Sequence, residues 1–241
     1  VAQRFFAEEP AAEVLGRVPV WRLAGELLRH RSSVDLVVAR LDRLSAAFAL
    51  DASYVAVPEW VGAHAPVPED ASRFCRDRNS LLHNMTRARR AGLQPCVSHA
   101  ARDFEEFYDR MYLPFIRRRH AGQSVVSNRS RLRRCFRQGG LMWALRGEER
   151  VAGGLFRTRR RTLALVVIGT ADGALDPLRD GAAFALNLFL FEYARTIGCT
   201  VVDFGGSRPS PSDGLLRSKA CWDARVVASR TTFYDLCLSW H

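Results

Sequence analysis

The strongest constraint on the fold is a run of three strand patterns with almost no chain between them. Apolar segments at 140–146, 151–157 and 162–170 are separated only by a Gly-Glu-Glu turn and an Arg-Arg-Arg turn. Turns this short join neighbouring antiparallel strands. The pattern therefore predicts an antiparallel meander in the second half of the chain.

A long helix and a buried strand follow the meander. Residues 179–197 form an apolar helical pattern closed by Gly198, and 199–204 are typical of a buried strand. The other expected elements of this part are helices at 77–91, 101–119 and 129–137, a strand at 95–98, and a last strand or hairpin within 224–236. This order predicts an α+β fold, a central mixed sheet flanked by helices.

The N-terminal part has a different pattern. Residues 11–50 are rich in helical patterns, and 54–57 form a short strand. The stretch 58–70 carries three prolines, and we interpret it as a linker or an irregular crossing. We therefore expect a helix-rich segment or a partial copy of the main domain's fold at 1–75, and the main domain at 76–241.

Amino-acid composition indicates the cellular compartment in which the protein works. The chain has 241 residues, 48% of them apolar, and no apolar run approaches the roughly 18 residues that span a bilayer. Its six cysteines show no C-x-x-C pair and no metal-ligand spacing. That usage indicates reduced thiols that mostly fill the core. We expect a cytoplasmic protein with no metal and no membrane span.

The charge is concentrated in the middle of the chain. The net charge is +11, and residues 73–161 contain 22 arginines against seven acidic residues. Such a region attracts phosphate groups, and its affinity for a polyanion depends on salt. The alternative is a solvated surface that reflects the codon usage of a GC-rich coding sequence.

Lysine occurs only once, at Lys219, and the other basic residues are arginines. An ammonium is a compact point charge and a guanidinium is a planar fork, so the two do not substitute for each other at a reacting centre. We interpret Lys219 as a candidate for chemistry. The alternative is a chance surface residue.

Six short motifs follow one another over residues 76–232. They are Arg87–Gly92, Phe104–Tyr108, Arg118–Gly122, Gly147–Gly154, Gly198–Ser207 and Gly214–Lys219. Together they resemble the FemAB-like branch of the GNAT acyltransferase superfamily, which includes the BioF2-like domain and aminoacyl-tRNA-dependent transferases. The resemblance implies a GNAT fold, in which two central parallel strands splay apart, and those strands would be 162–170 and 199–204.

The resemblance also implies a reaction. An aminoacyl group would pass from aminoacyl-tRNA to an amine by direct attack, with no bound cofactor and no covalent enzyme intermediate, which makes tRNA the expected partner. One alternative is an acyl-CoA-dependent N-acyltransferase, although the CoA pyrophosphate loop is degenerate because Leu178 stands where a basic or amide residue is expected. A second alternative is a non-catalytic RNA-binding module.

Site residues are expected around the splayed strands. By resemblance, Lys219 would stabilise the charge that develops on the donor, but Ser218 replaces the family's aromatic residue and Trp222-Asp223 replaces its Trp-Gly. Asp203 would orient or deprotonate the amine, or else accept N–H groups of the following glycine turn. Expected contacts to the donor or its phosphates are Gly205, Gly206, Ser207, Arg208, Arg87, Arg89 and Arg90. Expected acceptor-side residues are Trp222, His120 and Glu192, with core packing or surface roles as their alternatives.

Overall fold

The predicted meander is present in the computed structural model, which describes residues 16–31, 33–120, 126–229 and 234–240. Strands β5 (Gly139–Arg146), β6 (Glu149–Arg159) and β7 (Thr162–Thr170) pair antiparallel in sequence order. They lie within a seven-stranded sheet of order β4-β5-β6-β7-β8-β3-β9. The remaining strands of this sheet are β3 (Val61–Pro66), β4 (Leu93–Ser98), β8 (Val201–Ser207) and β9 (Arg225–Ala228).

The only parallel neighbours in the described sheet are β7 and β8, and their pairing ends close to the start of both strands. Their pairing covers Thr162–Ala164 against Val201–Asp203 and then stops. On its other side β8 pairs with β3 from Val201 to Ser207, so beyond Asp203 it has only this neighbour. The expected splay between these two strands is therefore confirmed.

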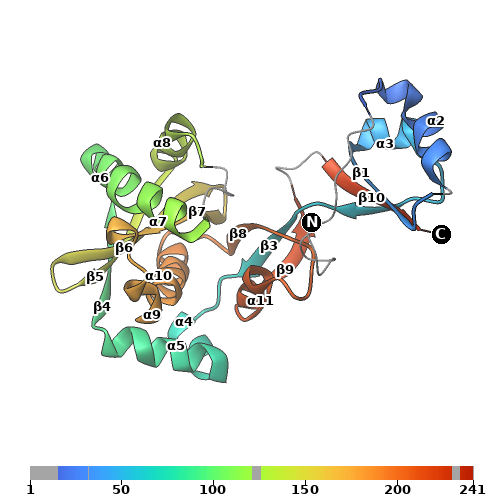
Figure 1. Cartoon of the computed structure of the whole chain (residues 1–241). Helices are drawn as coiled ribbons and strands as arrows, with labels where there is room; N and C mark the ends of the chain where they lie inside the picture. The colour runs from blue at the N-terminus through green and yellow to red at the C-terminus, as the bar shows by residue number, and fades with distance from the viewer. Residues whose placement is uncertain (1–15, 32, 121–125, 230–233, 241) are drawn as a thin grey trace. The chain divides into compact units, whose positions relative to one another are not determined.

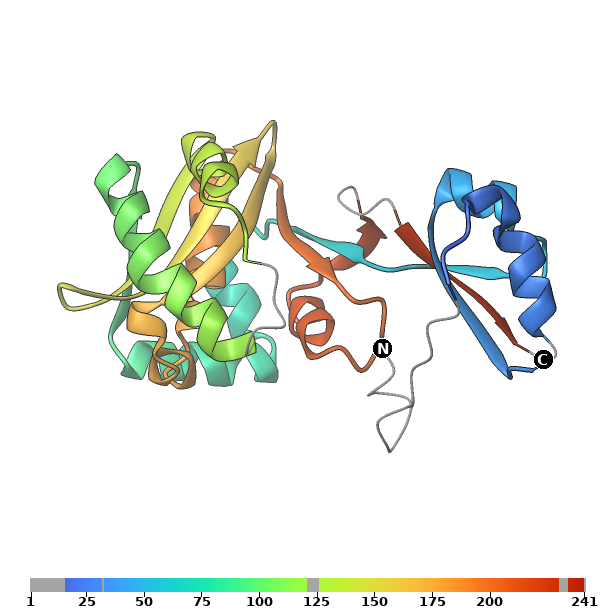
Figure 2. The ribbon, with the colours of Figure 1, turned by 45° about the horizontal axis from the view of Figure 1, so that its top comes forward.

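Helices cover both faces of this sheet, as alternating strand residues require. In β5, Leu141 and Trp143 face one hydrophobic cluster, and Met142 and Ala144 face the other. Figures 1 and 2 show the helices around residues 101–137 on one face and α9, α10 and α5 on the other. The helices of the first face are α6 (Ala101–Glu106), the π-helical turn η1 (Phe107–Tyr112), α7 (Leu113–His120) and α8 (Arg129–Arg137). Those of the second are α4 (Ala71–Arg76), α5 (Asn79–Arg90), α9 (Asp176–Arg179) and α10 (Ala182–Thr196).

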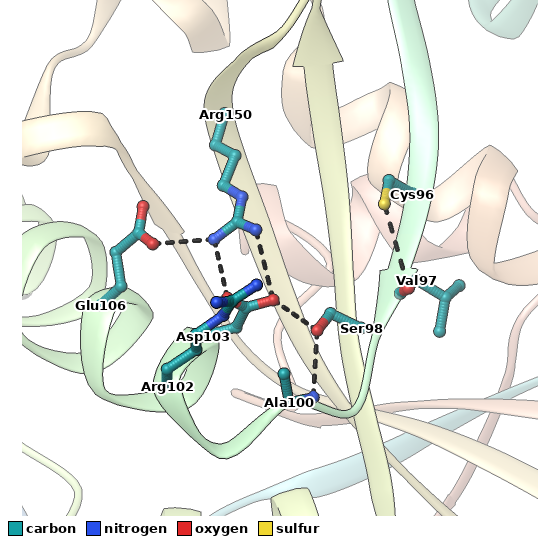
Figure 3. Close-up of polar contacts among 8 residues, drawn as sticks. All are labelled: Cys96, Val97, Ser98, Ala100, Arg102, Asp103, Glu106 and Arg150. Carbon is teal, nitrogen blue, oxygen red and sulfur yellow. Dashed lines mark hydrogen bonds and ion pairs between the residues drawn. The ribbon is translucent and has the colours of Figure 1, made fainter.

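A polar network fastens α6 to the sheet. Arg150 of β6 donates to both carboxylate oxygens of Asp103, at 3.1 and 3.2 Å, and to Glu106 at 2.7 Å (Figure 3). The Ser98 hydroxyl donates to Asp103 from the end of β4, at 2.5 Å. Burial pushes the pKa of Asp103 up, but the hydrogen bonds from Ser98 and Arg150 outweigh it and hold that pKa below its usual value.

The interpretation of 58–70 as a linker was wrong. The stretch contains β3, which pairs with β8 on one side and β9 on the other. Its prolines lie where strands tolerate them, since Pro58 and Pro66 are the last residues of β2 and β3 and Pro68 lies outside both. The prolines thus mark strand ends, and the strand between them is short and alanine-rich.

A second, smaller unit uses both ends of the chain. One unit is Trp60–Arg230, and the other combines the residues up to Glu59 with the C-terminal strand. In this smaller unit the three-stranded antiparallel sheet has the order β1-β10-β2. Its elements are α2 (Val20–Arg31), β1 (Leu36–Asp42), α3 (Arg43–Ala49), β2 (Val55–Pro58) and β10 (Tyr234–Trp240). The division at Glu59 differs from the one expected at residue 75. In place of the last strand or hairpin expected within 224–236 there are two strands of different sheets, β9 and β10.

Three further properties concern the described residues. All six cysteines are free thiols, and Cys75, Cys135, Cys199 and Cys237 are buried. Within the described ranges no helix is long and apolar enough to cross a membrane. No group of three or more His, Cys, Asp or Glu side chains in this part of the chain is placed to hold a metal ion.

Candidate active site

Strand β8 bulges where it has left β7. Gly62 pairs with Gly206 and His64 with Asp203, so two steps along β3 oppose three along β8. Gly205 takes up the extra residue with a φ of +69°, a conformation that glycine adopts without a steric penalty. The double glycine singled out in the sequence therefore makes a β-bulge beside the splay.

Lys219 is buried against this bulge. It lies on α11 (Gly214–Ala220), whose first turn is capped by the Asp213 carboxylate, which accepts from Leu216 N at 2.8 Å. Its side chain is only 5% exposed. Nζ donates to the carbonyl of Gly205 at 3.1 Å and to that of Gly206 at 2.8 Å. The third hydrogen bond goes to the Ser207 hydroxyl at 2.8 Å, so all three ammonium protons are engaged.

The environment of Lys219 also shifts its titration. Burial lowers the pKa of the ammonium to about 8, against the opposing attraction of the Asp203 and Asp213 carboxylates. The group is therefore mostly charged at neutral pH and loses its proton in the mildly alkaline range.

Asp203 occupies the start of the same bulge. Its Oδ1 accepts the backbone N–H of Gly205 at 2.8 Å, which is the turn-stabilising role given as the alternative for this residue. The same oxygen lies 3.7 Å from Nε2 of His64 on the neighbouring strand. One carboxylate therefore links the bulge to a histidine.

His64 is a functional candidate that the sequence did not reveal. It lies in β3, directly paired with Asp203 on one side and Arg225 of β9 on the other, so these three side chains share one face of the sheet. Its side chain is 40% exposed, which leaves the ring accessible. The only signal in the sequence was a single polar side chain in the otherwise apolar segment Val61–Pro66, which lies between other prolines.

The structure brings together five of the expected site residues. Lys219, Asp203, Gly205, Gly206 and Ser207 contact one another directly at the bulge. Arg208 follows immediately, is exposed, and forms no side-chain hydrogen bond or ion pair with another described residue.

Trp222 is a core residue and does not wall an open site. It is buried, with its ring 5.0 Å from that of Phe191 and 5.3 Å from that of Phe184, nearly parallel to both. Phe74 stacks on it at 6.3 Å. The core-packing alternative for this residue is thus the observed one.

Of the other acceptor-side candidates, Glu192 does not meet the bulge. Glu192 of α10 faces α4, where it accepts a hydrogen bond from the Ser72 hydroxyl at 3.3 Å, and burial raises the pKa of its carboxyl group. It lines a surface hollow of about 460 Å³ together with Asp70 and Arg195. His120 ends α7, and its side chain lies outside the described part of the structure.

Three of the four arginines expected to contact the donor or its phosphates, Arg87, Arg89 and Arg90, lie on α5, which packs on α4, α10 and β4. All three are exposed, and Arg87 Nη2 lies 3.2 Å from His83 Nε2. They form a surface separate from the bulge on β8.

The start of α10 is the place where a GNAT enzyme would hold a CoA pyrophosphate. The residue there, Gly181, is buried, and a Cβ on it would lie 3.3 Å from the backbone nitrogen of Ala88 and 3.4 Å from the carbonyl of Asn84. Both neighbours belong to α5. The helix start is therefore packed against another helix at this point.

Comparison with solved structures supports the architecture. L-PGS from Bacillus licheniformis is 14% identical over 90% of this chain and 71% of its own, with a TM-score of 0.51. A C-terminal domain assigned to a lysylphosphatidylglycerol synthetase from Agrobacterium fabrum is 11% identical over 88% and 64%, with a TM-score of 0.50. FemX is 11% identical over 88% and 68%, with a TM-score of 0.50. The chain thus spans about two thirds of the length of each.

Sequence comparison adds no assignment. No protein-family model matches the chain, and no curated protein matches it. At identities of 11–14% the solved structures bear on the fold alone. Three observations identify the fold: the mixed sheet, its splayed parallel strands and the similarity to these solved structures. The chain has the GNAT-like fold that its sequence predicts.

Proposed function

We propose that this chain is an aminoacyltransferase that moves an aminoacyl group from aminoacyl-tRNA to an amine. The observation that carries the proposal is the buried lysine at the bulge of β8, placed where β7 and β8 separate. A splay between these strands is where GNAT enzymes hold the acyl donor. The names of the structural neighbours, FemX and lysylphosphatidylglycerol synthetase, point to the same class of reaction.

The reaction needs a base and a stabilised carbonyl oxygen. The acceptor amine gives up a proton, and its nitrogen attacks the ester carbonyl carbon of the donor. A C–N bond forms, the C–O ester bond breaks, and the terminal ribose oxygen of the tRNA leaves and takes up a proton. Asp203 and His64 are the groups in this region that would accept the amine proton, since their side chains share one face of the sheet beside the splay.

Lys219 contributes mainly through charge and position. Its three donors are engaged by the bulge, so its hydrogen bonds fix the backbone of Gly205 and Gly206 beside the reacting groups. Its positive charge, which is buried and therefore little screened by water, favours the oxyanion that develops on the carbonyl. Lys219 is therefore a positioning residue for the bulge, and its charge also stabilises the oxyanion.

Two observations favour tRNA over CoA as the donor. The start of α10, where a CoA pyrophosphate would bind, is packed against α5 at Gly181. The middle of the chain carries a large excess of arginine, and phosphate contacts supply much of the affinity for a nucleic acid.

Donor binding tests the proposal. The purified protein is titrated with aminoacylated tRNA, deacylated tRNA and acetyl-CoA at two salt concentrations, with affinity followed by fluorescence. We expect salt-sensitive binding of tRNA and no saturable binding of acetyl-CoA. Saturable, nearly salt-independent binding of acetyl-CoA would replace the proposal by the acyl-CoA-dependent alternative.

Lys219→Ala separates the enzyme from a non-catalytic RNA-binding module. Transfer of a labelled amino acid from charged tRNA to hydroxylamine should fall by about 10²–10³-fold, because preorganised charge of this kind is a large catalytic term. The affinity for tRNA should stay within about threefold. If transfer by the wild type is detectable and the variant retains it, Lys219 has no part in the reaction. If the wild type binds tRNA and transfers nothing to hydroxylamine or to other small amines, the binding-module alternative holds.

A further inference from the structure

An unpaired stripe of arginines runs along α8. Arg131, Arg134 and Arg137 recur every three residues and therefore share one side of the helix, over roughly 9 Å of its axis. All three are exposed, and none of their side chains forms a hydrogen bond or ion pair with a residue that the structure describes. The opposite side of the helix is apolar, and its Leu132, Cys135 and Phe136 are buried against the sheet.

The remaining arginines of α8 behave differently. Arg129 forms ion pairs with Glu105, at 3.0 Å, and with Asp109. Arg133 pairs with Glu105 at 2.5 Å. The acidic side chains of the preceding helix are thus already engaged, and they leave the stripe without a counter-charge.

The stripe continues onto the hairpin that joins β6 and β7. Thr158 of β6 donates both its N–H and its hydroxyl to the carbonyl of Gln138, the residue that caps α8, at 2.9 Å each. Arg157 and Arg159 alternate with Thr158, which puts them on the face of the sheet that α8 covers. Arg160 and Arg161 follow in the turn, and all four arginines are exposed.

The surrounding sequence adds to the positive potential. Between Asp109 and Asp172 only Glu148 and Glu149 are acidic, against 15 arginines. We define the arginine surface as Arg131, Arg134, Arg137, Arg157, Arg159, Arg160 and Arg161.

We propose that the arginine surface binds the phosphate backbone of RNA. Guanidinium groups suit this role because each presents a planar fork of donors that matches two phosphate oxygens. Exposed arginines with no protein counter-charge are free to release the counterions of a polyanion. The inference rests on the proposed function, which supplies the RNA as tRNA, and it assigns the docking face to α8 and the β6–β7 hairpin rather than to α5.

An anionic membrane is the rival partner, and the apolar pattern of α8 argues against it. A helix that lies on a bilayer inserts large apolar side chains from its membrane-facing side. In α8 the apolar side faces the protein core, and the side that carries the stripe has only polar residues. The surface therefore offers phosphate contacts without an apolar anchor.

The test compares two triple variants of equal charge change. One is Arg131→Gln, Arg134→Gln, Arg137→Gln, and its matched control is Arg73→Gln, Arg110→Gln, Arg179→Gln, whose residues are exposed arginines on other elements of the same unit. The probe is unfractionated deacylated tRNA, titrated from 50 to 300 mM salt, with circular dichroism to verify folding. We expect the α8 variant to lose about tenfold or more in affinity, and the slope of log affinity against log salt to fall by about 2 to 3. The control should stay within about threefold of the wild type.

Each other outcome overturns a distinct claim. If the wild type binds tRNA and the α8 variant binds equally well, the docking face is elsewhere, and the proposed donor still stands. If the wild type binds no tRNA, the proposed donor fails together with the docking face. If the α8 variant keeps tRNA binding but loses binding to vesicles of phosphatidylglycerol and phosphatidylcholine, the surface faces a membrane and the RNA assignment is wrong.

Discussion

At the scale of single residues, the environment of Lys219 combines a full set of hydrogen bonds with a charge that burial disfavours. Its three acceptors satisfy the ammonium, yet its pKa is lowered to about 8 because the group is removed from water. The unfolded chain, where a lysine titrates near 10.5, therefore binds more protons between these two values.

This difference predicts a pH dependence of stability. Because the unfolded state binds the extra proton, the free energy of unfolding should rise with pH through the window from about 8 to 10.5. Relative to Lys219→Met, the wild type should gain about 1–3 kcal/mol between pH 7.5 and pH 10, at about 1.4 kcal/mol for each unit of pKa difference. Urea denaturation of both proteins across that range measures it, and groups that titrate alike in both cancel. A difference that is flat with pH would mean that Lys219 has an ordinary pKa.

Some residues of the site contact partners that are close in the sequence, and others contact partners that are far away in it. Asp203, Gly205, Gly206 and Ser207 lie within one short motif, and a lysine one helix later reaches them, so sequence proximity predicted their meeting. His64 comes from a strand more than 130 residues earlier, and only sheet pairing brings it to Asp203. Trp222 faces the core because three phenylalanines from other elements stack on it. The sequence around Trp222 does not specify these contacts.

At the scale of elements, the helix predicted at 101–119 is continuous but irregular. Its middle turn, Phe107–Tyr112, is π-helical and lies against β7. A Cβ on Gly169 of β7 would be 2.7 Å from the backbone of Met111, so the close approach depends on this glycine. Apolar periodicity predicted the helix because its buried face is intact, but the same periodicity gives no sign of the wider turn.

The contacts of α6 lead to a prediction about Arg150. Replacing it by Met leaves the Asp103 carboxylate, 7% exposed, with Ser98 and without its bidentate partner. The free energy of unfolding at pH 6 should fall by about 3 kcal/mol, because removing one partner of a buried pair strands the other charge. Wild-type Asp103 has a lowered pKa, so its contribution is lost as the pH falls through that value, and the difference between the two proteins should shrink toward pH 3.

Denaturation in guanidinium chloride at pH 3 to 6 measures this difference. Arg102→Met is the control, since that side chain is 90% exposed and lies 3.8 Å from the same carboxylate. It should change the free energy of unfolding by less than about 0.5 kcal/mol. Equal losses in the two variants would show that the network in Figure 3 does not fasten α6.

Short-range patterns identified most elements of the larger unit. The meander, α5, α8 and the long helix before β8 follow from periodicity and turns. The short strand β3 was missed because prolines lie on both sides of it. The last strand or hairpin expected within 224–236 proved to be β9 and the start of β10, because the sequence does not say which sheet a strand joins. Strand pairing is decided by side-chain packing across the sheet, which single-strand patterns do not contain.

At the scale of the whole molecule, the C-terminal strand belongs with the N-terminal elements. Strand β10 is the central strand of its sheet, paired with β1 over Leu36–Asp42 and with β2 over Val55–Pro58. A division of the chain at a single point, such as the one expected at residue 75, cannot describe such a unit. Among its described residues this unit buries few apolar side chains, including Val37, Ala49 and Cys237, whereas Trp60–Arg230 contains two large hydrophobic clusters.

This arrangement predicts unequal stability. Amide hydrogens of β1, β2 and β10 should exchange faster than those of β5 and β6, because the smaller unit has less buried apolar surface to oppose opening. A chain that ends at residue 230 loses the central strand, which leaves β1 and β2 without a pairing partner. Protection of β1 and β2 should then disappear while that of β5 and β6 is retained, as mass spectrometry of exchanged peptides would show. A global loss of protection in the shortened chain would instead mean that the two units fold as one, and the seven-stranded sheet would then depend on a strand that lies outside it.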